Sequence, residues 1–227
     1  MALELDHVFI CCARGAPEGD ALVRLGILEG SPNTHPGQGT ANRRFFFRNA
    51  YLELLWVSDP VEARSEQTRR TRLWDRWSGR MSGACPFGLI FRADGAGTAE
   101  APFATWAYRP GYLPPGLAIE FAEDVPLEEP ALAWLPFLHR AGPPAHEPTD
   151  HSLPMRELCG VTANLPSADL SLPSQAVRSA GLVDYRPGTR YLLELSFLAM
   201  KEVAFDLRPE LPLLLRGVVT GAGLSSC

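Results

Sequence analysis

The sequence has no long hydrophobic run. No stretch approaches the 18 or more consecutive apolar residues of a membrane-spanning helix, so we expect no membrane partner. The first twelve residues, MALELDHVFICC, contain no basic segment followed by an apolar one, which argues against a secretory signal peptide. A cytoplasmic location is therefore expected.

Positive charge is also scarce. Lys and Arg number 21 against 26 Asp and Glu, which gives a formal net charge of -5. Nucleic-acid binding usually needs a basic face, and the one arginine-rich run, residues 64–80, is interrupted by acidic residues. We therefore expect a small-molecule partner and no nucleic acid, and a homodimer is left open.

Several chemical motifs are missing. The five cysteines form no CxxC pair with metal spacing, and reduced thiols in a bacterial-type cytoplasm are the expected state. The chain contains no GxSxG and no HExxH, and GAGTAE at 95–100 lacks the strand-helix context of a nucleotide-binding loop. A cysteine-histidine pair stays open, although no cysteine has a persuasive setting.

What is present is an ordinary globular composition. Hydrophobic residues make up 46% of the chain and charged residues 21%, and 227 residues suit one large or two small domains. A chain of this length buries about 70% of its unfolded surface, so it needs neither a disulfide nor a metal to fold. Twenty-one prolines and twenty glycines predict many turns and short elements.

The pattern of apolar residues predicts an α+β fold with repeated units. The first third reads as a strand, a helix and a hairpin, and the last third reads as β-α-β-β-β. Three short segments of the expected strands resemble one another: YLELL at 51–55, LAIEF at 117–121 and YLLEL at 191–195. We predict degenerate βαβββ modules that form a curved mixed sheet around a cleft. Expected strands are 5–12, 43–48, 51–57, 87–92, 103–108, 117–121, 157–165, 190–197, 202–207 and 211–216; expected helices are 17–30, 61–80 and 171–181.

The predicted division of the chain follows from these elements. It consists of a first module (1–60), a linking helix (61–86), a second sheet segment (87–125), a proline-rich connection (126–156) and a C-terminal module (157–227). The apolar stretch 131–138 is interpreted as part of that connection, packed on the surface.

One charged residue lies inside a strand that is otherwise apolar. Glu53 is flanked by Leu52 and Leu54, and neither face of its strand is obviously exposed to water. An unpaired buried carboxylate costs several kcal/mol or must stay protonated, so a cation is expected beside it. Either a metal ion or an ion pair with Arg43 or Arg44 meets this need.

His7 raises the same question on the first strand. An imidazole and a carboxylate that face one cleft are two of the three ligands of a facial triad. The alternative is a hydrogen-bonded core histidine.

Three segments of the first third resemble the glyoxalase-like branch of the vicinal oxygen chelate superfamily: DHVFI, HPGQGTANRRFFF and YLEL. The resemblance covers residues 5–57 well, and 87–121 and 157–197 more loosely. It implies paired βαβββ modules around a divalent metal (Fe, Mn, Zn or Ni), held by a first-strand His and a later-strand Glu of each half. His7 and Glu53 match those positions in the first half.

The second half departs from the pattern. Aligning FGLIF and CGVTA on DHVFI places Gly88 and Gly160 where a second ligand is expected, and glycine has no side chain to offer. Glu120 and Glu194 both qualify as the second glutamate, and Glu120 is preferred because Glu194 has Arg190 or Lys201 nearby. A solvated strand end remains the other interpretation of Glu120. The predicted metal ligands are His7, Glu53 and Glu120, with the two glutamates as candidate catalytic bases; the loop residue His151 is an alternative third ligand.

Substrate contacts are predicted from the loop at 31–43 and from two strands. His35 and Asn42 are candidates because that loop can cover the cleft, although a plain strand-entry loop is an alternative. Arg92 is a candidate anchor for a substrate carboxylate, or else a partner of Glu120. Trp56 is interpreted as cleft wall or core.

The leading functional hypothesis is a metal-dependent enzyme that chelates a small substrate through vicinal oxygens. The metal then acts as a Lewis acid, with isomerase, lyase and dioxygenase chemistry all open. The second hypothesis is a metal-free protein of the same fold that binds or sequesters a small molecule.

Overall fold

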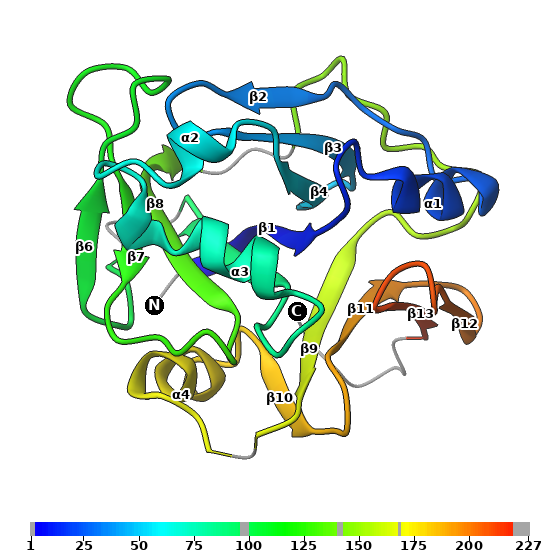
Figure 1. Ribbon diagram of the computed structural model, residues 1–227. Coiled ribbons are helices and arrows are strands. Elements are labelled where there is room, and N and C mark those ends of the chain that lie inside the picture. Colours follow the sequence, from blue (N-terminus) through cyan, green and yellow to red (C-terminus); the bar gives the residue numbers. More distant parts are fainter. Residues whose placement is uncertain (1–2, 96–99, 140–142, 168, 220–227) are drawn as a thin grey trace.

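The computed structural model describes residues 3–95, 100–139, 143–167 and 169–219, which form two β-sheets with a few short helices (Figure 1). The first sheet has eight strands in the order β2-β3-β4-β1-β5-β8-β7-β6. Its strands are β1 (Leu3–Cys11), β2 (Asn33–His35), β3 (Thr40–Phe46), β4 (Tyr51–Val57), β5 (Phe87–Ala93), β6 (Thr105–Tyr108), β7 (Ile119–Ala122) and β8 (Ala131–His139).

The first sheet consists of two similar halves. β1 and β5 pair antiparallel at its centre, and each has a parallel neighbour on its other side, β4 and β8 respectively. The order β1-β4-β3-β2 is therefore repeated as β5-β8-β7-β6. This arrangement confirms the α+β fold with paired modules and a curved sheet.

The second module differs from its prediction at β8. Residues 131–138 were predicted to belong to a surface connection, but Ala131–His139 forms a strand beside β5, and residues 131–135 are buried. A parallel strand covered on both faces is continuously apolar and shows no alternation, so ALAWL has the composition of such a strand. Prolines at 130 and 136 concealed it in the sequence.

The second sheet is built by the C-terminal part of the chain. Its strand order is β10-β9-β11-β13-β12. These strands are β9 (Leu158–Leu165), β10 (Asp184–Pro187), β11 (Leu192–Leu198), β12 (Val203–Asp206) and β13 (Leu213–Val218). The helix α4 (Leu172–Ser179) follows β9, and the side chain of Ser171 caps it as predicted.

The other helices are shorter than predicted. The first helical segment comprises η1 (Pro17–Gly19) and α1 (Asp20–Arg24) and ends at Gly26, whose φ of 87° suits a helix stop, rather than at Gly30. The predicted helix 61–80 is divided into α2 (Pro60–Ala63), η2 (Arg69–Thr71) and α3 (Leu73–Gly79). Arg72, with a left-handed φ of 55°, separates η2 from α3.

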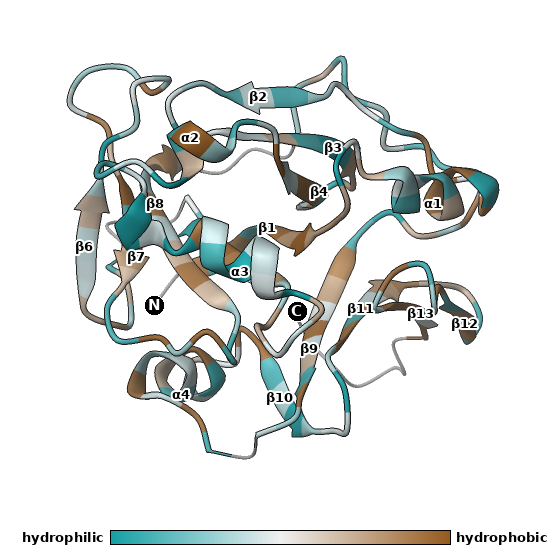
Figure 2. Cartoon of the chain, in the orientation of Figure 1, coloured by the Kyte–Doolittle hydropathy of each residue, from teal (hydrophilic) through white to brown (hydrophobic). Residues whose placement is uncertain are grey.

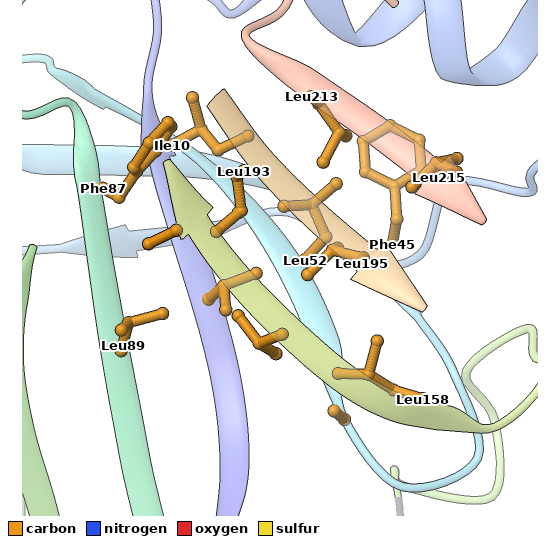
Figure 3. Close-up of a cluster of buried hydrophobic side chains, with 14 of the residues drawn as sticks. Ile10, Phe45, Leu52, Phe87, Leu89, Leu158, Leu193, Leu195, Leu213 and Leu215 are labelled. Atoms are coloured by element: carbon orange, nitrogen blue, oxygen red, sulfur yellow. The ribbon is translucent and has the colours of Figure 1, made fainter. Parts of the chain in front are cut away.

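The main hydrophobic core lies between the two sheets. Ile10, Phe45 and Leu52 of the first sheet pack in one cluster with Leu193 and Leu215 of the second (Figure 3). The edge strands β2 and β10 are coloured hydrophilic, whereas β1, β8 and β9 carry much hydrophobic colour (Figure 2). No helix in the part of the chain that the structure describes is long and apolar enough to cross a membrane.

Alternation along β1 divides its side chains between two environments. Val8 and Ile10 point toward the second sheet, while His7 and Phe9 point to the opposite face of the first sheet. The candidate site lies on that opposite face.

Candidate functional site

A pocket of about 190 Å³ opens on the face of the first sheet that carries His7 and Glu53. Its polar end is lined by His7, Asn33, His35, Gln38, Asn42, Arg44, Tyr51, Glu53 and Tyr112. Its apolar end is lined by Phe9, Leu55, Leu73, Ile90, Leu113, Ile119, Phe121, Leu135 and Phe137. The first module thus supplies nearly all the polar groups, and the second module supplies most of the apolar wall.

Glu53 is buried at the polar end, and its two carboxylate oxygens have different partners. The side-chain amide of Asn42 donates a hydrogen bond of 2.5 Å to Oε1. Oε2 lies 3.5 Å from Nε2 of His7. An amide and an imidazole therefore accompany this carboxylate.

Neither arginine considered as the partner of Glu53 fills that role. Arg43 pairs with Glu29 and Asp20 on the other side of β3. The side chain of Arg44 shares the pocket with Glu53, but its Nε donates to the carbonyl of Ser31. This corrects the expected ion pair: β3 brings Arg44 opposite Glu53 in register, yet its guanidinium contacts the carbonyl of Ser31 and lies 3.8 Å from Glu147.

His7 is held on both sides of its ring. Nδ1 lies 2.7 Å from Oδ2 of Asp6, and the ring of Tyr51 stacks on the imidazole with centroids 4.4 Å apart. Asp6 also accepts a 2.6 Å hydrogen bond from Nη1 of Arg92. A continuous chain of contacts therefore runs from Arg92 through Asp6 and His7 to Glu53.

Burial shifts the pKa values of several groups around the site. It lowers the pKa of His35 and raises the pKa values of Tyr51 and Tyr112, so the imidazole of His35 and both phenols stay neutral at pH 7. Burial raises the pKa of Asp6 too, but hydrogen bonds and charge from His7 and Arg92 outweigh it and leave that pKa below its ordinary value. Asp6 is a carboxylate at neutral pH.

The predicted third ligand does not join this group. Ile119 and Phe121 of β7 line the pocket, so alternation places Glu120 on the opposite face of the sheet. Glu194 lies in the second sheet, where Asn164 and Arg216 donate to it. His151 is buried elsewhere, between the amide of Leu28 and the carbonyl of Phe46.

The donor set is too small for the three-ligand metal centre that the resemblance implies. Across the pocket from His7 and Glu53, β5 and β8 present only Ile90, Leu135 and Phe137. Within the described ranges no group of three or more His, Cys, Asp or Glu side chains is placed to hold a metal ion. Two protein ligands fall short of the three found in catalytic zinc and facial-triad sites.

Gly88, the aligned position of the missing ligand, has its space filled by Phe9. The two residues are paired in register across β1 and β5. A Cβ atom on Gly88 would lie 2.0 Å from Cε1 of the Phe9 ring. Packing thus excludes a ligand side chain at position 88. Gly160, the other aligned position, belongs to β9 of the second sheet and not to the sheet that carries the pocket.

Of the four residues predicted to contact a substrate, two line the pocket and two do not. His35 and Asn42 line the pocket, although Asn42 is also engaged with Glu53. Trp56 packs against the core between the sheets, and Arg92 is committed to Glu4, Asp6 and the carbonyl of Asn49, so neither lines the pocket.

Several site residues were not predicted from the sequence. Tyr51 shares the strand parity of Glu53, and that parity is a signal for it. Tyr112 donates a 3.0 Å hydrogen bond to Gln38 between two loops that line the pocket, and no local sequence pattern predicts such a contact. Asp6 was missed as well, because in a regular strand the side chain of a residue points to the face opposite that of its neighbour.

The fold and this pocket define a glyoxalase-like protein with a pocket on the face of a curved sheet of paired modules. The sequence matches the model of the glyoxalase-like domain over residues 5–174. The chain belongs to this family, and with it to the vicinal oxygen chelate superfamily, whose members typically use divalent metals.

The solved structures that align with this chain are distant from it in sequence. A hypothetical protein from Staphylococcus aureus aligns with a TM-score of 0.51 and 11% identity, over 96% of this chain and 100% of that one. A methylmalonyl-CoA epimerase in complex with methylmalonyl-CoA and NH4+ aligns at 0.42 and 14%, over 63% and 100%. A fusion of a xylose isomerase-like TIM barrel and 4-hydroxyphenylpyruvate dioxygenase aligns at 0.46 and 11%, over 88% and 38%. No curated protein matches the sequence.

Proposed function

We propose that this protein is a glyoxalase-like enzyme that moves a proton on a small molecule bound in the pocket, and that it does so without a resident metal. The observation that supports this most is the Glu53–His7 pair. It lies at the polar end of a pocket whose opposite wall offers no metal ligand.

The lining selects a ligand with two different ends. Arg44 and the amide and hydroxyl groups of Gln38 and Tyr112 suit carbonyl or carboxylate oxygens. Phe9, Ile90 and the other side chains of the second-module wall suit an aliphatic or aromatic body. The expected substrate is a small carbonyl compound with adjacent oxygens and an apolar substituent.

Glu53 is the proposed base for such a substrate. Its carboxylate takes the proton from the carbon next to the carbonyl, and the electron pair of the broken C–H bond moves to the carbonyl oxygen. Return of the proton to another position or face completes an isomerisation. Asn42 holds Oε1, and His7 lies beside Oε2 as a second group able to carry the proton.

Solvent-deuterium incorporation tests this proposal. A panel of 2-oxo acids, 2-hydroxy ketones and 1,2-diketones with apolar substituents is incubated with the protein in D2O and followed by proton NMR. We expect faster exchange for at least one compound. Glu53→Gln lowers the rate by about 10²–10⁴-fold, the usual contribution of a general base. Glu120→Gln, the same change on the opposite face of the sheet, leaves the rate unchanged.

Whether the protein contains a bound metal is measured separately. Protein purified without chelator is analysed for Fe, Mn, Zn and Ni, together with His7→Ala. We expect no stoichiometric metal in either protein, and exchange activity that survives dialysis against a chelator. One metal per chain that disappears in His7→Ala contradicts the metal-independent part of the proposal.

The apolar wall by itself favours a second candidate function, the sequestration of a small molecule. A protein that sequesters a small aromatic molecule needs such a wall but no proton transfer. Saturable binding of panel compounds by titration calorimetry, with no exchange of any of them, supports sequestration over catalysis.

A further inference from the structure

We propose that Asp6 and Arg92 are positioning residues that hold His7 with its proton on Nδ1 and its Nε2 lone pair toward the pocket. This inference deepens the proposed function of the pocket and rests on it for its catalytic meaning. The structural claim about His7 stands on contacts that do not touch a substrate.

The contact between Asp6 and His7 depends on an irregularity in β1. Consecutive side chains of a regular strand point to opposite faces, which keeps a carboxylate away from the ring of the next residue. The register of β1 with β5 shifts between Leu5 and His7, so Asp6 is an extra residue in a β-bulge. Bulges re-aim side chains and are common beside active sites. Here the bulge brings Asp6 Oδ2 within 2.7 Å of His7 Nδ1.

Arg92 fixes the carboxylate once the bulge has turned it. Its Nη1 donates to Oδ1 of Asp6 at 2.6 Å, its Nε to Glu4, and its Nη2 to the backbone carbonyl of Asn49. The side chains of Arg92 and Asp6 are only 7% and 9% exposed. Three contacts to β1 and to the β3–β4 turn leave this guanidinium little freedom, so Asp6 has one orientation.

The chemistry of the imidazole then follows. A carboxylate accepts hydrogen bonds and donates none, so the contact with Asp6 places the ring proton on Nδ1. In the neutral ring Nε2 is therefore the acceptor, and it points toward Oε2 of Glu53. Stacking of Tyr51 fixes the ring plane. Thus His7 is oriented to receive a proton at the position where a bound substrate meets Glu53.

The tautomer is directly measurable in the wild-type protein. Long-range 1H–15N NMR at alkaline pH distinguishes the two neutral forms of each histidine ring, and a His7→Gln variant assigns the signals of His7. We expect His7 to be protonated on Nδ1. A ring protonated on Nε2, or on both nitrogens, overturns the proposal without reference to any variant or to activity.

Variants then identify what sets the tautomer. D6N offers an amide donor to Nδ1, so the ring proton moves to Nε2. R92K keeps the charge but loses the three-way contact, and we expect a mixture of the two forms. Glu4→Gln is the matched control, because it makes the same chemical change in another partner of Arg92 and leaves the Nδ1 form intact. An unchanged His7 spectrum in folded D6N contradicts the inference.

Kinetics separate positioning from folding and from the proposed function. With a panel compound that exchanges, D6N lowers kcat at least about tenfold and leaves KM nearly unchanged, since Asp6 does not line the pocket. If His7 carries its proton on Nδ1 but no panel compound exchanges with solvent, the enzyme proposal alone is wrong. If a compound exchanges in a Glu53-dependent way while His7 carries its proton on Nε2, the positioning proposal alone is wrong.

Discussion

Single residues determine the chemical character of the pocket. Burying Glu53 without partners would cost several kcal/mol, and the fold gives it the donating amide of Asn42, with the His7 ring 3.5 Å away, instead of a guanidinium. On the opposite wall, Gly88 leaves room for the Phe9 ring where the family pattern implies a ligand. Glu53 on β4 and Gly88 on β5, which flank Phe9 of β1 in register, thus contribute to one polar and one apolar wall of the pocket.

Gly88→Ala tests this packing. A Cβ atom 2.0 Å from the Phe9 ring forces the ring to move, so we expect the free energy of unfolding to fall by about 1–3 kcal/mol, measured by urea denaturation. Gly160→Ala is the control, because its Cβ would meet Ser196 at an ordinary 3.5 Å. In the background of Phe9→Leu the cost of Gly88→Ala should shrink. An equal loss in both backgrounds would show that Phe9 is not the obstacle.

At the scale of elements, a residue two positions before β8 connects the two parts of the chain. Glu129 is buried and accepts hydrogen bonds from the backbone amide and hydroxyl of Ser171 and from the hydroxyl of Ser174. These donors belong to the N-terminal end of α4. The segment predicted to be a surface connection therefore contributes a central strand and also holds the helix of the C-terminal unit.

Replacing this carboxylate should loosen α4. Glu129→Ala leaves the buried hydroxyl of Ser174 and the half-buried hydroxyl and amide of Ser171 without their acceptor, which costs about 1–3 kcal/mol of stability. Hydrogen exchange should report the loss first in residues 172–179. Glu128→Ala, at an exposed neighbouring position, should change neither quantity. Normal protection of α4 in Glu129→Ala would contradict the assigned contact.

For the whole molecule, one core serves both sheets. Phe197 of β11 is fully buried, with its ring 4.6 Å from that of Phe47, the residue after β3. The pocket lies on the other face of the first sheet, so this core supports the strands that carry His7 and Glu53 without entering the site. Cooperative unfolding of both sheets follows from such packing.

Tryptophan fluorescence can test that cooperativity. All five tryptophans lie between residues 56 and 134, outside the second sheet. Phe197→Ala in the second sheet should nevertheless lower the unfolding free energy seen by tryptophan by about 3–5 kcal/mol, because a large buried ring is removed. Met200→Ala, at a position 96% exposed, should leave the curve in place. A tryptophan transition that ignores Phe197→Ala would mean that the sheets unfold separately.

Much of this architecture was predictable, and so was part of the site. Alternation and turn residues predicted most strands, and parity along Tyr51–Val57 placed Glu53 on a face with Tyr51 and Leu55. The same rules failed for Ala131–His139, since a strand buried on both faces has no alternation. They also failed for Asp6, since a bulge interrupts the period on which they depend.

The sequence alone determined that a buried carboxylate and a histidine on separate strands of a glyoxalase-like module needed partners. Which partners they have was decided by tertiary structure. Strand register and a single bulge bring Asn42 and His7 to Glu53 and Asp6 to His7. Strand parity turns Glu120 away, and the Phe9 ring occupies the space above Gly88. Register, parity and packing of this kind arise between distant segments, and no local pattern of residues encodes them.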